Sequence, residues 1–185
     1  MKRLLAIVTF VAASLALTSP AHAGLLIEPS LGYAFIGEAE GDGSKDDLSG
    51  LAYGARFGVT SLGFMVGAEY MGTLFTIDAS DNPKLNSTNL GIFAGYSFPI
   101  LLRAYATYFF YNQATYKESG TEVDFRGSGL KLGVGYKGLP FVSLNLEYLM
   151  QTYKEARVGG SPWADLSTDV KANTLMFTVS LPFSI

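Results

Sequence analysis

The sequence predicts an all-β protein, a closed eight-stranded antiparallel up-and-down transmembrane β-barrel. Eight segments alternate apolar residues with small or polar ones, as expected when successive side chains of a strand point to opposite faces. The connections between these segments alternate between short and long, which is typical of barrels in the bacterial outer membrane. The chain also begins with a segment typical of exported proteins. These three observations agree on the fold and on the location.

The first 23 residues are predicted to be a secretory signal peptide. Lys2 and Arg3 precede an apolar run over residues 4–17, and Ala21-His22-Ala23 places small residues at the positions that signal peptidase recognises. A membrane-anchoring helix needs about 20 apolar residues, and this run is shorter and is followed by Ser19-Pro20. We therefore expect cleavage after Ala23, which leaves residues 24–185 as one outer-membrane barrel domain.

Composition excludes several classes of function. Without residues 1–23 the chain has 11 Lys and Arg against 16 Asp and Glu, a net charge of −5, so nucleic acid is not an expected partner. The chain has no cysteine, which excludes disulfides and a lipoprotein anchor. Its one histidine, His22, lies in the predicted signal peptide, so neither a Ser-His pair nor histidine-assisted acyl transfer can be built. We expect no enzymatic activity and no cofactor.

The strands follow one another as hairpins. The predicted strands cover residues 25–35, 51–59, 64–74, 89–98, 102–111, 129–136, 141–152 and 174–185. Short turns over residues 60–63, 99–100 and 137–140 join three of the hairpins, whereas long polar connections are expected over residues 37–49, 78–87, 114–124 and 154–168. The last of these holds the only tryptophan, Trp163. This asymmetry predicts tight periplasmic turns at one end of the barrel and extended external loops at the other.

The two faces of the predicted strands differ in bulk. One face carries large aromatic residues, among them Tyr53, Phe57, Tyr70, Tyr108 and Tyr148, while the other is rich in glycine and has few charges. A soluble barrel of the lipocalin kind would turn the apolar face inward. The bore of eight strands is too narrow for so many aromatic rings, so we expect this face to contact lipid and the glycine-rich face to line the lumen. The aromatic residues also gather towards the strand ends, as the two membrane interfaces require.

Six charged residues fall on the predicted inward face, one in each of six strands: Glu28, Arg56, Glu69, Arg103, Lys131 and Glu147. Three acids balance three bases. Because a buried charge is tolerated only when it is paired, we interpret the six as an ion-paired network that closes the lumen. The turn at residues 137–140 would set Lys131 nearly opposite Glu147, and the preceding hairpin would set Arg56 diagonal to Glu69. A charged constriction that selects ions is the alternative.

The signal peptide, the eight strands, the asymmetric connections and the lumenal charges together resemble the small outer-membrane barrels of the OmpA/OmpX type. The resemblance covers residues 24–185. The alternation Phe177, Val179, Leu181, Phe183 and Ile185 resembles the family's barrel-assembly signal, although the chain has isoleucine where the family has a terminal aromatic. The resemblance implies location in the cell outer membrane, contact with outer-membrane lipid and lipopolysaccharide, and recognition of the C-terminal strand by the barrel-assembly machinery. We expect a monomer that serves envelope structure or surface interaction through its external loops, whose partner the sequence does not identify.

A narrow channel is the second functional interpretation. Tyr105, Phe109 and Tyr111 are expected to point inward beside Arg103. Further apolar side chains expected in the lumen are Met65, Met71, Phe93, Leu149 and Met176. A partly apolar lumen could pass or hold a small hydrophobic molecule, as is thought of barrels that resemble OmpW. The competing explanation is that these side chains fill the space left by the glycines.

The predicted first external loop is acidic. Residues 37–47 carry five carboxylates and one lysine, which raises the possibility of a divalent cation. Their spacing does not match the EF-hand loop, which has glycine at the sixth position and a bidentate glutamate at the twelfth. We expect a solvated, charge-repelled loop and no metal site.

Overall fold

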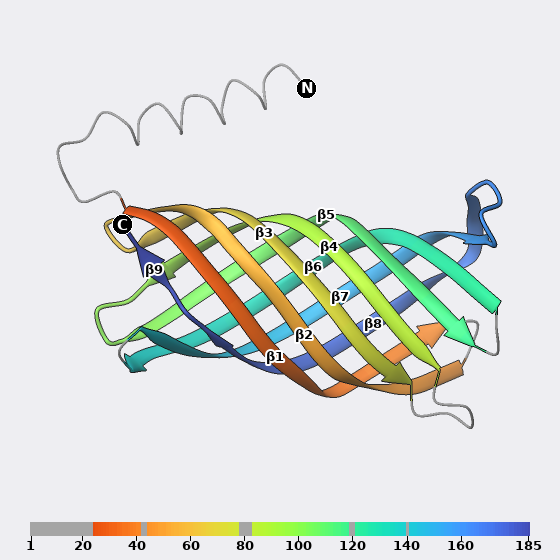
Figure 1. The fold of residues 1–185 in the computed structure, drawn as a ribbon, viewed down its shortest axis with the longest axis horizontal. Coiled ribbons are helices and arrows are strands. Elements are labelled where there is room, and N and C mark those ends of the chain that lie inside the picture. The colour runs from red at the N-terminus through yellow and green to blue at the C-terminus, as the bar shows by residue number, and fades with distance from the viewer. Residues whose placement is uncertain (1–23, 42–43, 78–82, 119–120, 140) are drawn as a thin grey trace, which may run out of the picture.

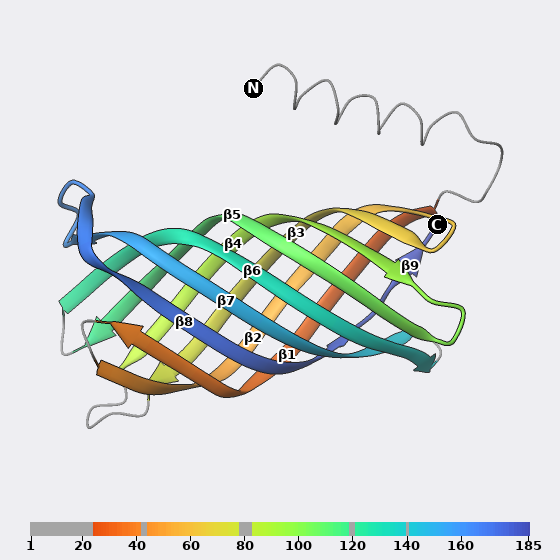
Figure 2. The same cartoon turned by 180° about the vertical axis from the view of Figure 1, so that it is seen from behind.

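A computed structural model describes residues 24–41, 44–77, 83–118, 121–139 and 141–185. The predicted signal peptide, residues 1–23, lies outside the described residues. The described chain folds into one antiparallel sheet that curls into a closed barrel (Figures 1 and 2). Its strands are β1 Gly24–Gly41, β2 Ser44–Ser61, β3 Phe64–Ile77, β4 Lys84–Ser97, β5 Leu102–Glu118, β6 Thr121–Leu139, β7 Val142–Val158, β8 Ala164–Ser180 and β9 Phe183–Ser184. In the described part of the chain no helix is long and apolar enough to cross a membrane.

Each strand pairs with its neighbours in sequence, and β1 pairs with β8 to close the ring of eight. The predicted fold class is therefore confirmed. β9 is a short resumption of β8, because pairing stops after Ser180 and returns where Phe183 lies opposite Ile27. Pro182 falls in the gap, and proline has no backbone N–H to donate to β1.

The short turns and both ends of the described chain lie at one end of the barrel (Figure 1). Ser61 pairs with Phe64 across a two-residue turn, Leu62-Gly63, in which both residues have positive φ. Such a turn matches the twist of the two strands, although leucine adopts this conformation rarely. These tight turns agree with the predicted periplasmic end.

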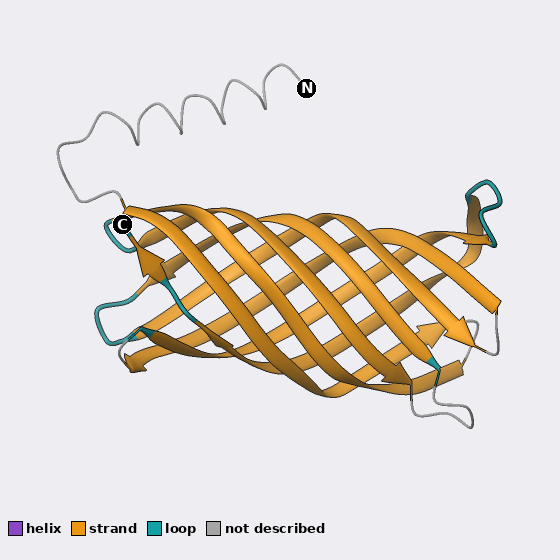
Figure 3. Cartoon of the chain, viewed as in Figure 1, coloured by secondary structure: helices purple, strands orange, loops and turns teal. Residues whose placement is uncertain are grey.

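The long connections predicted at the other end are mostly strand, so that expectation was wrong (Figure 3). β5 continues to Glu118 and β6 begins at Thr121, while β7 reaches Val158 and β8 begins at Ala164. Continued pairing satisfies the backbone N–H and C=O groups of these polar segments beyond the apolar part of the wall. The residues between strands at this end are 42–43, 78–83, 119–120 and 159–163. Of these, 42–43, 78–82 and 119–120 lie outside the described residues.

The apolar face of the sheet points outward. Leu31, Phe57 and Tyr108 are between 52% and 60% exposed, although all three would be core residues in a soluble protein. The inward face is buried and holds polar, charged and apolar side chains. This arrangement confirms the predicted assignment of the two faces and rules out the lipocalin-like orientation, because an exterior so apolar requires a bilayer.

A bulge changes which residues of β5 face inward. Phe109 is buried, as predicted, but Phe110 and Tyr111 both point outward and Asn112 is the next buried residue. The prediction that Tyr111 lines the lumen was therefore wrong. The pairing of β5 with β6 shifts between Phe109 and Asn112, and the extra residue of a bulge inverts the alternation beyond it.

Candidate functional site: an ion-paired lumen

The six charged residues predicted for the lumen all lie inside the barrel, each no more than 2% exposed: Glu28, Arg56, Glu69, Arg103, Lys131 and Glu147. They come from six strands and meet in the bore nearer to the short-turn end. Period-two alternation turns each of them inward, and the curvature of the sheet brings distant strands together.

Arg103 forms one half of the network. Its Nη1 donates to Glu28 Oε2 at 2.8 Å, and its Nη2 donates to Glu28 Oε1. The same guanidinium group donates to Asn145 Oδ1 at 2.7 Å and to Ser180 Oγ at 3.0 Å. This is a bidentate pair with further polar support, the arrangement that best offsets the cost of burying charge.

Arg56 lies at the centre of the network. Its Nη2 donates to Glu147 Oε1 at 2.9 Å, while Glu28 and Glu69 lie at 3.6 Å and 3.5 Å from its other nitrogens. The guanidinium carbon lies 3.9 Å from the centre of the Tyr105 ring, which is close enough for a cation–π contact. Arg56 thus contacts all three lumenal acids.

Lys131 is the second cation that contacts Glu69 and Glu147. Its Nζ donates to Glu69 and, at 3.2 Å, to Glu147 Oε1. The predicted register was wrong by two residues, because Lys131 pairs with Leu149 and Gly133 pairs with Glu147. β6 continues to Leu139, which pairs with Val142, so the chain turns later than the expected 137–140 turn and the pairing of the two strands moves with it.

The register of the β2–β3 hairpin also differs from the prediction. Arg56 lies directly opposite Glu69, not diagonal to it. The turn is two residues long where four were expected, which moves the pairing by two residues.

Two hydroxyl groups complete the network, and sequence reasoning missed their roles. Tyr105 donates from its hydroxyl to Glu147, and Thr107 donates to Glu69. Both lie on β5 at the same parity as Arg103. The alternation shows that they point inward, but it does not say which residue each one meets across the bore.

Side chains fill the rest of the lumen on both sides of the charge network. Predicted lumenal residues that are buried are Met65, Met71, Phe93, Tyr105, Phe109, Leu149 and Met176. In the half of the lumen away from the short turns, Gln151 donates to Asn89 at 3.0 Å and to Asn112 at 3.2 Å. The sequence did not reveal this polar layer. Large side chains therefore occupy the space that inward glycines leave.

A second cluster lies beyond the apolar part of the wall, at the end opposite the short turns. It is formed by the ends of β5, β6 and β7 that continue past the apolar wall, here called the strand extensions, and by the segment that follows β7. Arg126 and Arg157 stack on the ring of Trp163, with guanidinium carbons 4.2 Å and 4.5 Å from its centre. Arg157 also donates to Asp124 at 2.9 Å, and the hydroxyl of Thr115 donates to the same carboxylate at 2.7 Å. The Thr115 hydrogen bond and the charge of Arg157 lower the pKa of Asp124. The cluster combines an aromatic ring with two cations, each of which has an acidic partner: Asp124 for Arg157 and Glu155 for Arg126.

The acidic segment predicted as the first external loop is largely paired strand. Glu38 lies opposite Asp47, and Glu40 lies opposite Lys45. Lys45 forms ion pairs with Glu38 and Glu40, and the hydrogen bond to Glu38 raises the pKa of Lys45. Among the described residues no group of three or more histidine, cysteine or acidic residues is arranged to hold a metal ion.

Comparison with known proteins identifies solved structures that share this architecture. No family model matches the chain, and no curated protein matches it in sequence. Neisserial surface protein A superposes with a TM-score of 0.56 at 17% identity, covering 86% of this chain and 97% of that one. Ail, the attachment invasion locus protein of Yersinia pestis, superposes with a TM-score of 0.58 at 15% identity, covering 86% and 99%. A second Ail structure, in complex with the heparin analogue sucrose octasulfate, gives a TM-score of 0.55 at 15% identity over the same shares.

The chain has the fold of the small eight-stranded outer-membrane barrels of the OmpA/OmpX type. That fold and the apolar exterior together make it an outer-membrane protein, because only a bilayer covers such an exterior. In an outer-membrane barrel the short turns face the periplasm and the strand extensions face outward. The Trp163 cluster is then on the cell surface, and the charge network lies within the membrane.

Proposed function

We propose that this protein is a non-enzymatic outer-membrane barrel with a closed lumen, which supports the envelope or makes surface contacts through its strand extensions. The observation that carries the proposal is the network around Arg56. Its contacts with Glu28 and Glu69 reach the two strands beside β2, and its contact with Glu147 reaches β7 across the bore. Three bases neutralise three acids there, so no net charge remains to attract ions through the bore.

The absence of a catalytic base in the barrel supports the non-enzymatic part of the proposal. The sequence has no histidine beyond His22, which lies before the barrel domain. The acids of the lumen are held by Arg56, Arg103 and Lys131, so none is left to activate a hydroxyl group.

Electrical conductance of planar lipid bilayers tests whether the lumen is closed. The purified barrel should give no discrete current steps, whereas Arg103→Ala removes the side chain that joins β5 to β1 and should give small, flickering steps. Lys45→Ala, which removes an exposed cation of the outer surface, is the matched control and should stay silent. Regular steps in the unmodified protein would overturn the closed lumen and favour the narrow channel. Silence of Arg103→Ala would show that Arg103 is not needed to block the bore.

We also propose that the Trp163 cluster is the surface that meets an anionic glycan, such as the phosphorylated sugars of lipopolysaccharide. The Arg126 and Arg157 side chains are 45% and 32% exposed, and both stack on the ring. Arg126 lies 3.6 Å from Glu155, beyond hydrogen-bond distance, so its guanidinium group keeps donors for a ligand. The complex of Ail with sucrose octasulfate shows that a barrel of this fold can hold a polyanionic sugar.

Sucrose octasulfate is the probe for this second proposal, and Trp163 is its reporter because it is the only tryptophan. Titration should change the intensity of Trp163 fluorescence in a saturable way, and Arg126→Ala should abolish the change. Lys45→Ala should titrate like the unmodified protein. A response that persists in Arg126→Ala, or the absence of any response, would contradict binding at this cluster.

Two further expectations from the resemblance remain proposals. We propose that the barrel-assembly machinery recognises the C-terminal strand, with Phe183 as the outward aromatic; this side chain is 45% exposed. We also propose that the protein is a monomer whose mature chain begins at Gly24, where β1 starts.

A further inference from the structure

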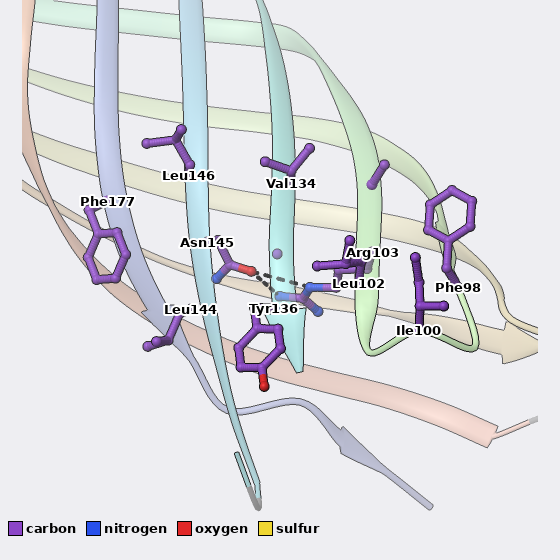
Figure 4. Close-up of a pocket in the computed structure, with 12 residues that line it drawn as sticks. Phe98, Ile100, Leu102, Arg103, Val134, Tyr136, Leu144, Asn145, Leu146 and Phe177 are labelled. Carbon is purple, nitrogen blue, oxygen red and sulfur yellow. Dashed lines mark hydrogen bonds between the residues drawn. The ribbon is translucent and has the colours of Figure 1, made fainter. Parts of the chain in front are cut away.

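The outer wall of the barrel is hollowed near its short-turn end. A groove of about 680 Å³ opens there, and its lining is apolar apart from the polar atoms of inward residues behind the wall (Figure 4). The lining side chains come from β5 to β8 and from the β4–β5 turn. Those that project outward include Leu102, Val134, Tyr136, Leu146 and Phe177, all between 44% and 57% exposed.

Small residues in one row of the sheet create the groove. Ala104 lies opposite Val134, which lies opposite Leu146, and Leu146 lies opposite Phe177. The neighbouring row towards the turns carries the larger Leu102, Tyr136 and Leu144 in register. Ala104 and Val134 are the shortest of these side chains, so the wall is lower along them. Behind them the wall is rigid, because Arg103 donates to Asn145 on its inner side (Figure 4).

We propose that this groove is a binding site for one acyl chain of a phospholipid in the periplasmic leaflet. The groove faces hydrocarbon, and the bilayer offers no water to fill an apolar hollow of this size. Its volume lies within the range of about 300–1,000 Å³ that is typical of ligand sites. Its place near the short turns sets it at the height of the inner leaflet, which consists of phospholipid, whereas lipopolysaccharide lies in the outer leaflet.

Tyr136 provides a polar contact at the correct end of the groove. A side chain at Gly138 would meet the Tyr136 hydroxyl at 2.0 Å, so this hydroxyl lies over the backbone next to the β6–β7 turn. That position is at the membrane interface, where a tyrosine keeps its ring in hydrocarbon and its hydroxyl among headgroups. The same residue can therefore contact the acyl chain with its ring and the headgroup with its hydroxyl.

A second copy of the chain fits the groove less well than an acyl chain. Two barrels in one membrane, related by a two-fold axis, would set this patch against itself at the same height. A hollow facing a hollow leaves a void, and protein interfaces of useful strength are packed as densely as interiors. A flexible chain that enters from the bilayer can follow the floor formed by Ala104 and Val134.

Native mass spectrometry of the full-length protein as exported and purified tests the site. The barrel is reconstituted in vesicles of phosphatidylethanolamine and phosphatidylglycerol, extracted in mild detergent and measured with its retained lipids. Ala104→Phe and, independently, Val134→Phe fill the floor of the groove from the outside. Ala68→Phe is the matched control, because Ala68 is an exposed outward residue on β3, outside the groove. Unchanged urea resistance establishes that each variant is folded.

The unmodified protein and Ala68→Phe should retain one phospholipid, and both groove variants should lose it. Equal retention in all four proteins, or no retention in any, would overturn the site. A dimer in the unmodified protein that Ala104→Phe disrupts would also overturn it, because it would show that a second copy occupies the groove.

Discussion

Arg103 on β5 holds both carboxylate oxygens of Glu28 on β1. In a ring of eight strands β5 stands opposite β1, so this one pair spans the diameter of the bore. The pair therefore connects two opposite strands directly. Asn145 on β7 and Ser180 on β8, which lie between those strands in the ring, accept hydrogen bonds from the same guanidinium group.

Removing the Arg103–Glu28 pair should destabilise the barrel. In Arg103→Ala the buried Glu28 keeps Arg56, at 3.6 Å, as its one ion-pair partner among the described residues, and breaking a buried pair costs about 3–5 kcal/mol. Urea unfolding in detergent micelles measures the loss. Glu28→Gln added to Arg103→Ala should recover part of it, because the unpaired charge is then gone. An unchanged unfolding midpoint in Arg103→Ala would contradict the role of the pair.

Lys131 and Glu69 should be energetically coupled. Lys131→Met leaves Glu69 and Glu147 with Arg56 as their only remaining ion-pair partner among the described residues, and Glu69→Gln removes one of the two acids. The double variant should be more stable than Lys131→Met alone, with a coupling energy of about 0.5–3 kcal/mol. A double-mutant cycle by urea unfolding gives this value. Strict additivity of the two changes would show that the contact contributes nothing.

Gly133 should not tolerate even a methyl group. A Cβ at this position would lie 2.3 Å from the Tyr105 ring, which is held by Arg56 on its face and by its hydrogen bond to Glu147. Gly133→Ala should cost about 1–3 kcal/mol of unfolding free energy, as overpacking does. Gly129→Ala, on the same strand, meets its nearest atom at 3.2 Å and should cost less. Equal losses in the two variants would rule out this steric explanation.

Acid should release the Trp163 cluster. The pKa of Asp124 is lowered in the folded protein, so its interaction with Arg157 is fully present above the pKa of an unfolded aspartate, about 3.9. The interaction is lost as the pH falls through the lower, folded-state pKa. Trp163 fluorescence should therefore titrate below pH ~3.9. Asp124→Asn should remove that transition, and a transition that remains in this variant would assign it to another group.

Much of the fold follows from alternation alone. The period of two places Glu28, Arg56 and Glu69 inward and Phe57 outward, because a one-residue slip would bury the wrong face of the whole strand. The same pattern does not show which strand's residue each charge meets. Partners across the bore depend on the stagger between strands, as the pairing of Glu28 with Arg103 illustrates.

Two local features were also hidden from the sequence. The bulge after Phe109 turns Tyr111 outward, and no glycine of β5 marks it. The polar composition of residues 114–124 was interpreted as a loop, although Thr115 pairs with Asp124 in a continued hairpin. Polarity shows that a segment lies outside the membrane, but it does not show whether the segment remains paired. The outward face of these extensions is polar, and only their inward face packs apolar residues such as Ala114 and Phe125.

The continued pairing should make the outer surface resist hydrogen exchange. Backbone amides of Thr115, Phe125 and Ala156, which lie in paired extensions, should exchange slowly in the reconstituted barrel. Exchange measured by mass spectrometry with fragmentation reports them separately. Exchange as fast as in an unstructured peptide would show that these segments are loops, as the composition first indicated.

The pairing of β1 with β8 and β9 also sets the order in which the molecule can be completed. The first strand has no partner on one side until the last strand is in place, so every earlier stage of assembly has two open edges. Such edges join other chains readily, and a chain cut short before Ala164 would keep them permanently. Productive folding therefore requires that the free edge of β1 stays unpaired until β8 and β9 are in place.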